Sequence, residues 1–203
     1  MKEFTDYCHN GLQVEGAEKI DKIVIGVSFS KKLIEETVKA KAQMLIVHHG
    51  LFGELVNQPP QIKGFVKNRL KLLLKNDINL CGFHLPLDAH PIIGNNISLC
   101  KLFGVTGVKR FDVGFIGNLK QEIDFKDFVK EVEEKLATKT YSLAEGPKKI
   151  KTVGIISGGA SSEFKLAKES GVDVYLCGEI KESVVEAVKE SGLNFINAGH
   201  YNT

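Results

Sequence analysis

The fold is decided by the stretch Met44-Leu45-Ile46-Val47-His48-His49-Gly50, an apolar run that ends in two histidines and a glycine. A short, partly β-branched run of this kind predicts a buried strand. Similar apolar runs at 22–27 and 78–83 predict one strand before it and one after it. The two intervening segments carry apolar residues at helical spacing, so this part of the chain is predicted to fold as β–α–β–α–β.

Residues 151–200 repeat this plan, with apolar runs at 152–156, 172–177 and 193–198. In both halves polar residues that can bind metal follow the second and the third run. We therefore predict an α/β fold built from a duplicated β-α-β-α-β unit. Because open parallel sheets bind ligands at the carboxyl ends of their strands, we expect a metal site at these ends, between the two halves.

Three segments are expected along the chain. Residues 1–104 form the first α/β half and residues 151–203 form the second. Residues 105–150 are a connector with a strand at 111–119 and an amphipathic helix, whose apolar positions are Phe125, Phe128, Val129, Val132 and Leu136.

The composition is that of an ordinary soluble globular protein, with 203 residues of which 43% are hydrophobic and 26% charged. A net charge of +2 gives no electrostatic case for nucleic acid or an anionic membrane as the main partner. No apolar run is long enough to span a bilayer, and the N-terminus has no signal-peptide core. The four cysteines are widely spaced, which favours buried thiols in a reducing cytoplasm: Cys8, Cys81, Cys100 and Cys177.

The adjacent histidines His48 and His49 are the strongest local indication of a metal site. Adjacent side chains on a strand point to opposite faces, but at a strand end the backbone can turn, so that both imidazoles reach one cleft, each on its own metal. The alternative is a pair of surface loop histidines. The pair ends a buried strand, where an uncompensated polar pair would be costly, and this favours the metal site.

A second cluster, residues 84–90, follows the third predicted strand. Imidazole and carboxylate groups together suit Fe, Zn or Mn. Asp88 can ligate or bridge, whereas His84 can ligate, orient a neighbouring group or transfer a proton. The alternative for His84 and for His90 is turn structure around the nearby prolines, and for His90 we favour it.

The place of His200 in the repeat favours it as a site residue, because it follows the last predicted strand just as His84 follows the third. Gly199 before it lets the backbone come close. The turn at 157–159 precedes a helix and resembles an anion-binding cradle, although such turns are common. Cys8 and His9 are a weak candidate for a further metal pair.

Five ordered motifs resemble the Nif-three-like family, whose members are often labelled GTP cyclohydrolase I type 2 homologues. They are Asp6-Tyr7 with Asn10-Gly11-Leu12-Gln13-Val14-Glu15-Gly16, Val47 to Gly50, His84 to Pro91 with Gly94-Asn95-Asn96, Gly178-Glu179, and Ala198 to Thr203. The resemblance covers nearly the whole chain. It implies a dinuclear metal site in which His48, His49, Asp88 and His200 are the ligands and His84 lines the site.

The resemblance also implies a toroidal homohexamer with the metal sites facing its inner cavity. The chain departs from the family pattern in two places. The family has a helix before the motif that begins at Asn10, and a bridging Glu directly after the motif that ends at Thr203. We therefore expect a fragment of a longer chain, in which the residue after Thr203 is acidic and completes the metal shell.

The function expected on this basis is that of a dinuclear metal-dependent hydrolase. His84 would protonate the leaving group, and the family label alone suggests a purine nucleotide as the substrate. The alternative is a non-catalytic metal-binding, regulatory or assembly protein with the same ligands. The donor set does not discriminate among Fe, Zn, Mn and Ni.

Overall fold

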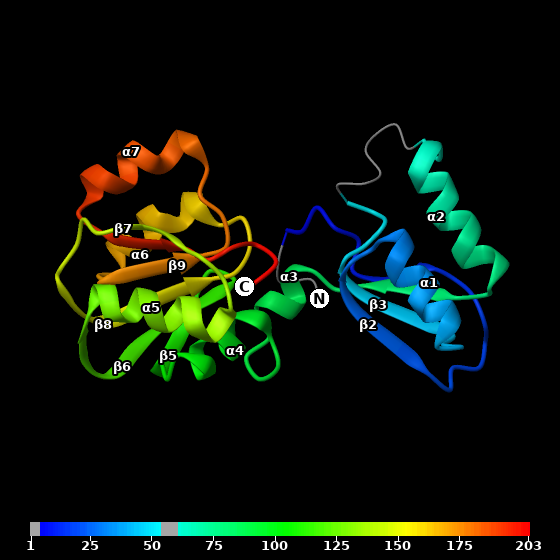
Figure 1. The fold of residues 1–203 in the computed structure, drawn as a ribbon, viewed down its shortest axis with the longest axis horizontal. Coiled ribbons are helices and arrows are strands. Elements are labelled where there is room, and N and C mark those ends of the chain that lie inside the picture. Colours follow the sequence, from blue (N-terminus) through cyan, green and yellow to red (C-terminus); the bar gives the residue numbers. More distant parts are fainter. Residues whose placement is uncertain (1–4, 54–60) are drawn as a thin grey trace. The chain divides into compact units, whose positions relative to one another are not determined.

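The computed structural model describes residues 5–53 and 61–203, and it divides into two compact units after Leu87 (Figure 1). Two mixed sheets and, within the described residues, seven α-helices make up the fold, which confirms the α/β class. Each unit has its own sheet and its own core.

The first unit has a four-stranded sheet with the order β1-β4-β3-β2. Strands β2, β3 and β4 are parallel to one another, and β1 pairs antiparallel with β4. The elements in chain order are β1 (Gly11–Val14), β2 (Ile23–Ser28), α1 (Lys31–Lys39), β3 (Met44–His49), α2 (Gly64–Lys75) and β4 (Asn79–Gly82).

Helices α1 and α2 cover one face of this sheet. Ile34 of α1 and Leu73 of α2 are fully buried against Leu45 and Leu80 of the strands. The strand register places a different apolar set on the opposite face, which we call the bare face. Four of its side chains are exposed in the structure: Leu12, Ile23, Ile25 and Val27.

The second unit has a six-stranded sheet with the order β5-β6-β8-β9-β10-β7. The short helix α3 (Leu85–Asp88) leads into it. The other elements are α4 (Asn95–Leu102), β5 (Thr106–Phe111), β6 (Gly114–Asp124), α5 (Phe125–Leu136), β7 (Tyr141–Leu143), β8 (Lys149–Ile156), the 3-10 turn η1 (Ser161–Glu163), α6 (Phe164–Glu169), β9 (Val174–Cys177), α7 (Glu182–Ser191) and β10 (Asn194–Asn197).

The duplication predicted from the sequence is confirmed in the strand pairing. Strands β8, β9 and β10 are parallel and neighbours in chain order, as β2, β3 and β4 are. The repeat is also one strand longer than expected, because β7 pairs antiparallel with β10 just as β1 pairs with β4. The segment 105–150, expected as a connector, supplies β5, β6, α5 and β7 to the second unit.

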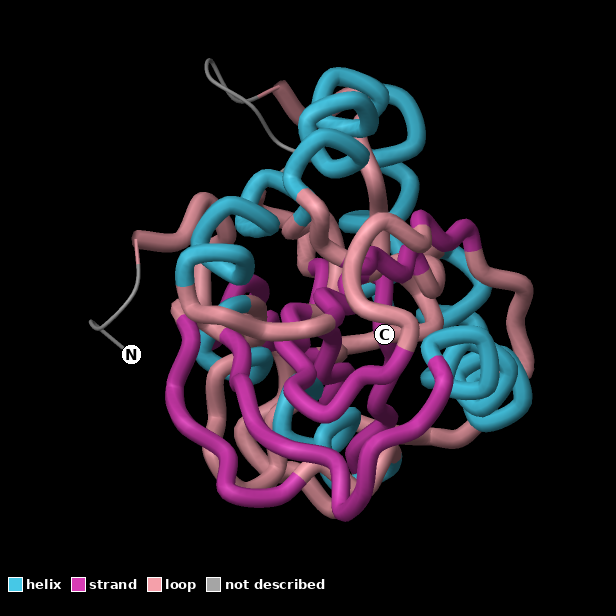
Figure 2. Tube along the Cα trace, turned by 90° about the vertical axis from the view of Figure 1, so that its left-hand side faces the viewer, coloured by secondary structure: helices cyan, strands magenta, loops and turns pink. Residues whose placement is uncertain are grey.

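The second sheet is covered on both faces. Val174 and Leu176 pack with α4 and α5, whereas Tyr175 between them points to the other face and contacts the ring of Phe195 at a centroid distance of 5.6 Å. Figure 1 shows α6 and α7 on the opposite side of the sheet from α4 and α5, and Figure 2 views the same strands (magenta) flanked by helices.

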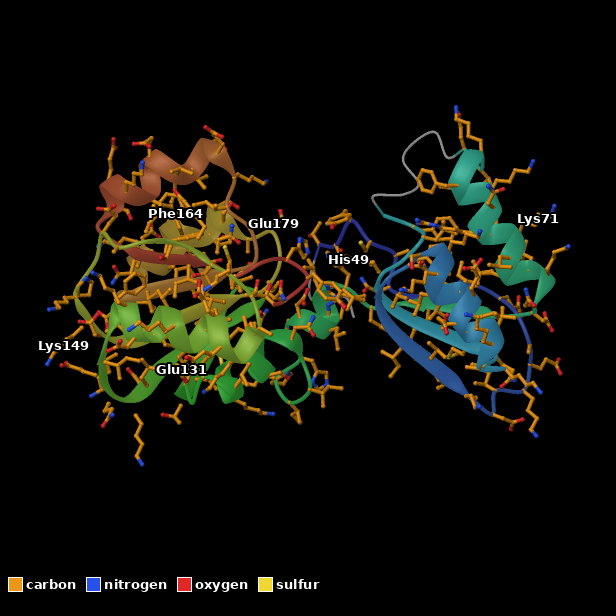
Figure 3. All side chains as sticks on the ribbon, viewed as in Figure 1. His49, Lys71, Glu131, Lys149, Phe164 and Glu179 are labelled. Carbon is orange, nitrogen blue, oxygen red and sulfur yellow. The ribbon has the colours of Figure 1, made fainter. Side chains whose placement is uncertain are left out.

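Charged side chains such as Lys71, Glu131 and Lys149 project from the outer surfaces of the units, whereas Phe164 is buried (Figure 3). Among the described helices, none has the length and apolar character needed to cross a membrane.

Candidate metal centre

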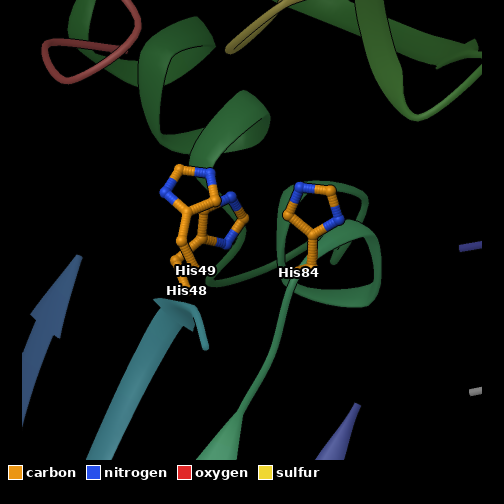
Figure 4. A group of neighbouring side chains, drawn as sticks. All are labelled: His48, His49 and His84. Atoms are coloured by element: carbon orange, nitrogen blue, oxygen red, sulfur yellow. The ribbon is translucent and has the colours of Figure 1, made fainter. Parts of the chain in front are cut away.

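The ends of β3 and β4 place three histidines together. These strands are parallel neighbours, with Val47 opposite Gly82, so the residues that follow emerge at the same edge of the sheet. His48 and His49 end β3, and His84 comes two residues after β4. The ring centroid of His48 lies 4.5 Å from that of His49 and 4.8 Å from that of His84 (Figure 4).

The donor atoms of these three imidazoles suit a metal ion. One ligand nitrogen from each of His48, His49 and His84 lies within 4.8 Å of the other two. Imidazole nitrogen is a common ligand of zinc and of other first-row metals, and three histidines form the protein shell of some catalytic zinc sites. The first unit alone therefore offers a three-nitrogen donor set.

A hydrogen bond at Nδ1 sets the tautomer of the His48 ring. His48 Nδ1 lies 2.9 Å from the carbonyl oxygen of Phe83, and a carbonyl can only accept, so Nδ1 carries the proton. The lone pair of the neutral ring is then on Nε2, as in a typical metal-ligating histidine. His49 Nδ1 lies 3.3 Å from the hydroxyl of Ser28, which can donate or accept.

His84 is held by a buried carboxylate from the N-terminal segment. Its Nδ1 lies 2.8 Å from Asp6 Oδ1, and the two side chains are only 8% and 6% exposed. Burial alone would raise the pKa of Asp6, but hydrogen bonds from Asn10, from the Cys8 N–H and from His84 outweigh it and hold that pKa below its ordinary value. An ionised Asp6 is a fixed acceptor for the His84 Nδ1–H.

Asp88 lies in the second unit and is buried. Its Oδ1 accepts hydrogen bonds from Asn95 Nδ2 at 2.7 Å and from the Ser157 hydroxyl at 3.1 Å. These bonds fix the carboxylate beside the turn that follows β8. Such partners orient metal-ligating carboxylates in many sites.

His200 lies against the same turn. Its Nδ1 forms a 2.5 Å hydrogen bond with Glu179, which follows β9. A Cβ atom at Gly158 would lie 3.0 Å from His200 Nε2, so the glycine makes room for the ring. The second unit thus gathers Asp88, Glu179 and His200 around residues 157–158.

The sequence-based candidates therefore fall into two groups. His48, His49 and His84 belong to the first unit, and Asp88 and His200 belong to the second. That the two groups share one pair of metals stays a proposal.

The weaker candidates have other environments. His90 is exposed, and its Nδ1 accepts from the Ile92 N–H, which fits the turn role favoured from the sequence. At the turn 157–159, the Gly158 N–H donates to the Thr203 hydroxyl at 3.0 Å. Cys8 groups with Asp6 and His84, with ligand atoms within 4.8 Å of one another, whereas His9 is not part of that group.

The roles of Asp6 and Glu179 were not assigned from the sequence. Glu179 carried a usable signal, since it follows β9 where His48 and His49 end β3. Apart from its place in a motif, Asp6 carried no sequence signal for its role, because its partner His84 lies 78 residues away in the chain.

Comparison with known proteins gives one consistent result. The sequence model of the Duf34/NIF3 (NGG1p interacting factor 3) family matches residues 1–203. A "GTP cyclohydrolase 1 type 2 homolog" of Haemophilus influenzae is 40% identical over 207 residues, covering 99% of this chain and 82% of that protein. Its namesake in Neisseria meningitidis serogroup A is 42% identical over 203 residues, covering 98% and 81%.

Solved structures agree. One described as "Structural genomics, protein ybgI, unknown function" has a TM-score of 0.92 and 40% identity, covering 98% of this chain and 81% of that one. TTHA1606 from Thermus thermophilus has a TM-score of 0.87 and 33% identity, covering 98% and 79%.

Proposed function

The chain belongs to the Duf34/NIF3 (NGG1p interacting factor 3) family, and on that premise we propose that it is a hydrolase dependent on two divalent metal ions. The observation that carries the proposal is the group of three imidazoles with ligand atoms within 4.8 Å. His48 and His49 are the proposed ligands from this group, and Asp88 and His200 are those from the second unit. The name shared by the relatives suggests a purine nucleotide such as GTP as the substrate.

Held by His48, His49, Asp88 and His200, two divalent ions would supply Lewis acidity that lowers the pKa of bound water and stabilises negative charge on oxygen. The side chains of this chain provide the remaining functions. Asp88, held by Asn95 and Ser157, supplies negative charge at a fixed position. His84 takes up a proton at Nε2 and delivers it to the leaving group. Its Nδ1–H remains hydrogen-bonded to the Asp6 carboxylate throughout.

The first test is metal analysis of the protein as purified, followed by a panel of nucleotides assayed with and without a chelator. We expect Fe, Zn, Mn or Ni to be present, and we expect chelation to abolish hydrolysis and re-addition of that metal to restore it. Hydrolysis that survives complete removal of metal would contradict the proposal.

His84→Gln tests the proton-transfer role. We expect metal content to stay unchanged and kcat to fall by about 10²–10⁴-fold, the usual contribution of a general acid or base. Metal content is measured by elemental mass spectrometry and kcat by product formation. His90→Gln, at an exposed histidine in a turn, is the matched control and should change neither. Loss of metal in His84→Gln would make His84 a ligand instead.

One observation favours a second function. His84 lies in the same donor group as His48 and His49, so all three imidazoles can bind one ion and leave no acid for catalysis. The protein would then be a non-catalytic metal-binding, regulatory or assembly protein. Full metal occupancy with no turnover on the nucleotide panel, together with metal loss in His84→Gln, is the result that this alternative predicts.

The family resemblance also supports a homohexamer, acting in the cytoplasm on a small molecule rather than on nucleic acid. All four cysteines are buried, and Cys81, Cys100 and Cys177 are free thiols in the described structure, which is compatible with a reducing compartment. Light scattering of the full-length protein should give about six times the mass of one chain, and a monomer would contradict the assembly.

A further inference from the structure

We propose that Asp6 is the positioning residue of His84, and that its carboxylate holds the imidazole in the tautomer with the proton on Nδ1 and the reactive lone pair on Nε2. The proposal rests on the proposed function for what His84 does at Nε2. The placement of the proton follows from contacts within the first unit and can be tested without any assay of turnover.

The other hydrogen bonds of Asp6 determine which group is the donor in its bond with His84. Oδ1 accepts from the Cys8 N–H at 2.9 Å, and Oδ2 accepts from the Leu85 N–H at 3.1 Å and from Asn10 Nδ2 at 2.8 Å. Backbone N–H groups cannot reverse their role. Each oxygen is therefore already an acceptor, and the 2.8 Å contact with His84 Nδ1 is completed by a proton on the imidazole.

Two further residues of the segment 6–10 hold His84 in place. The Asn10 side chain bridges the pair, because its Oδ1 accepts from the His84 N–H at 2.7 Å while its Nδ2 donates to Asp6. The Tyr7 ring lies edge-on to the imidazole, with centroids 5.0 Å apart and an interplanar angle of 66°. The backbone, the ring plane and Nδ1 of His84 are thus all fixed by one short segment.

The hydrogen bond at Nδ1 of His84 differs in kind from those at the other two clustered histidines. Nδ1 of His48 meets the carbonyl of Phe83, which no substitution removes, and Nδ1 of His49 meets the hydroxyl of Ser28. A carboxylate at Nδ1, as His84 has, fixes the tautomer and the orientation of the ring, which suits proton transfer or ligation at Nε2. A carboxylate–histidine couple serves the same purpose in the Ser-His-Asp triad.

The decisive variant is Asp6→Asn, which keeps the shape of the side chain. If the new NH2 group takes the Oδ2 position, it faces two other hydrogen-bond donors, Leu85 N–H and Asn10 Nδ2. At the Oδ1 position it opposes one fixed donor, Cys8 N–H, and can donate to His84 Nδ1. The second orientation leaves fewer unpaired groups, so we expect the His84 proton to move to Nε2.

The measurement is solid-state ¹⁵N NMR of metal-free protein labelled with ¹⁵N-histidine, at about pH 9, where imidazoles with ordinary pKa values are neutral. Loss of its signals in His84→Gln assigns the His84 ring. We expect Nδ1–H alone in the wild type and the Nε2–H form in Asp6→Asn. Asp21→Asn, at an exposed carboxylate of the same unit, is the matched control and should match the wild type.

Asp6→Ala is the second variant, and it should show the Nε2–H form in whole or in part because the acceptor is gone. If His84 keeps the pure Nδ1–H form in the folded Asp6 variants, the proposal is wrong. If the tautomer moves but no nucleotide is hydrolysed by the wild type, the Asp6 assignment stands and the hydrolase proposal fails.

Where the wild type turns over a substrate, Asp6→Asn should lower kcat by about 10–100-fold, as loss of a supporting partner usually does. Combined with His84→Gln, it should cost nothing further, because both changes act on one imidazole. Additive losses in the double variant would contradict a role through His84.

Discussion

At the scale of single residues, three of the candidate imidazoles are each held by a hydrogen bond at Nδ1. A main-chain carbonyl orients His48, the carboxylate of Asp6 orients His84, and Glu179 binds Nδ1 of His200. In each case the partner occupies Nδ1, so Nε2 is the nitrogen that the ring presents. The same solution thus recurs in both units with three different acceptors.

The cysteines give a residue-scale prediction. Burial raises the pKa of the Cys100 thiol to about 12, so at pH 8 only about 10⁻⁴ of it is thiolate, the form that reacts with alkylating agents. We expect no labelling of Cys100 by iodoacetamide in the native protein over an hour, and complete labelling in guanidinium. Peptide mass spectrometry distinguishes the two, and rapid native labelling at Cys100 would show that its burial is transient.

The site could be predicted in part from the sequence, for a physical reason. Strand ends can be found from apolar runs, and this places His48, His49, His84 and His200 at sheet edges. The partner of His84 could not be found in this way, because a hydrogen bond over 78 residues depends on how β1 pairs with β4. Local periodicity carries no information about that pairing.

At the scale of elements, each half uses the same four-strand order, in which the third parallel strand lies between an earlier parallel strand and an antiparallel one. The parallel strands could be predicted because each is a continuous apolar run, although β2 is not buried as expected and exposes Ile23, Ile25 and Val27. Strands β1 and β7 could not, because these short segments, GLQV and YSL, are not continuous apolar runs. Their existence follows from tertiary pairing rather than from local preference.

Helix ends give the element-scale prediction. Ala137 ends α5 in the left-handed conformation, with φ 48° and ψ 45°, and Gly192 ends α7 in nearly the same one, with φ 66° and ψ 32°. A Cβ atom costs roughly 1 kcal/mol there. We therefore expect Ala137→Gly to stabilise the protein by up to about 1 kcal/mol and Gly192→Ala to destabilise it by a similar amount.

Urea unfolding followed by circular dichroism measures both effects. Gly192→Ala is a fair counterpart, because the added methyl would meet its nearest neighbour at 3.7 Å, an ordinary contact, so backbone strain alone is tested. Equal stability of the wild type and both variants would show that the two helix ends relax out of the left-handed region.

At the scale of the whole molecule, the two units differ in how their sheets are covered. The second sheet is packed on both faces, whereas the bare face of the first unit exposes Ile25 to 77% and Ile23 to 48%. Ile23, Ile25 and Val27 alternate on one side of β2 and are all exposed, and large exposed apolar patches are unusual on monomeric soluble proteins.

Ile25→Thr tests whether that face is open to solvent. Thr is also β-branched and suits a strand, so we expect the free energy of unfolding to stay within about 0.5 kcal/mol of the wild type. Binding of the dye ANS should fall in proportion to the lost apolar area. Leu45→Ala, on the buried face, should instead cost about 2–5 kcal/mol. A similar loss in Ile25→Thr would show that the bare face is covered in solution.

The order of strands in the first sheet has a consequence for the time at which the site forms. Strand β1 is synthesised before the other strands of the first sheet, yet its partner is β4, which ends at Gly82. Until the ribosome has delivered that strand, the segment that carries Asp6 has nothing to dock on, and His84 does not yet exist. At about 5–20 residues per second, the nascent chain holds His48 and His49 for several seconds before the third imidazole can join them. The candidate site of the first unit therefore cannot be complete before β4 and His84 have been synthesised.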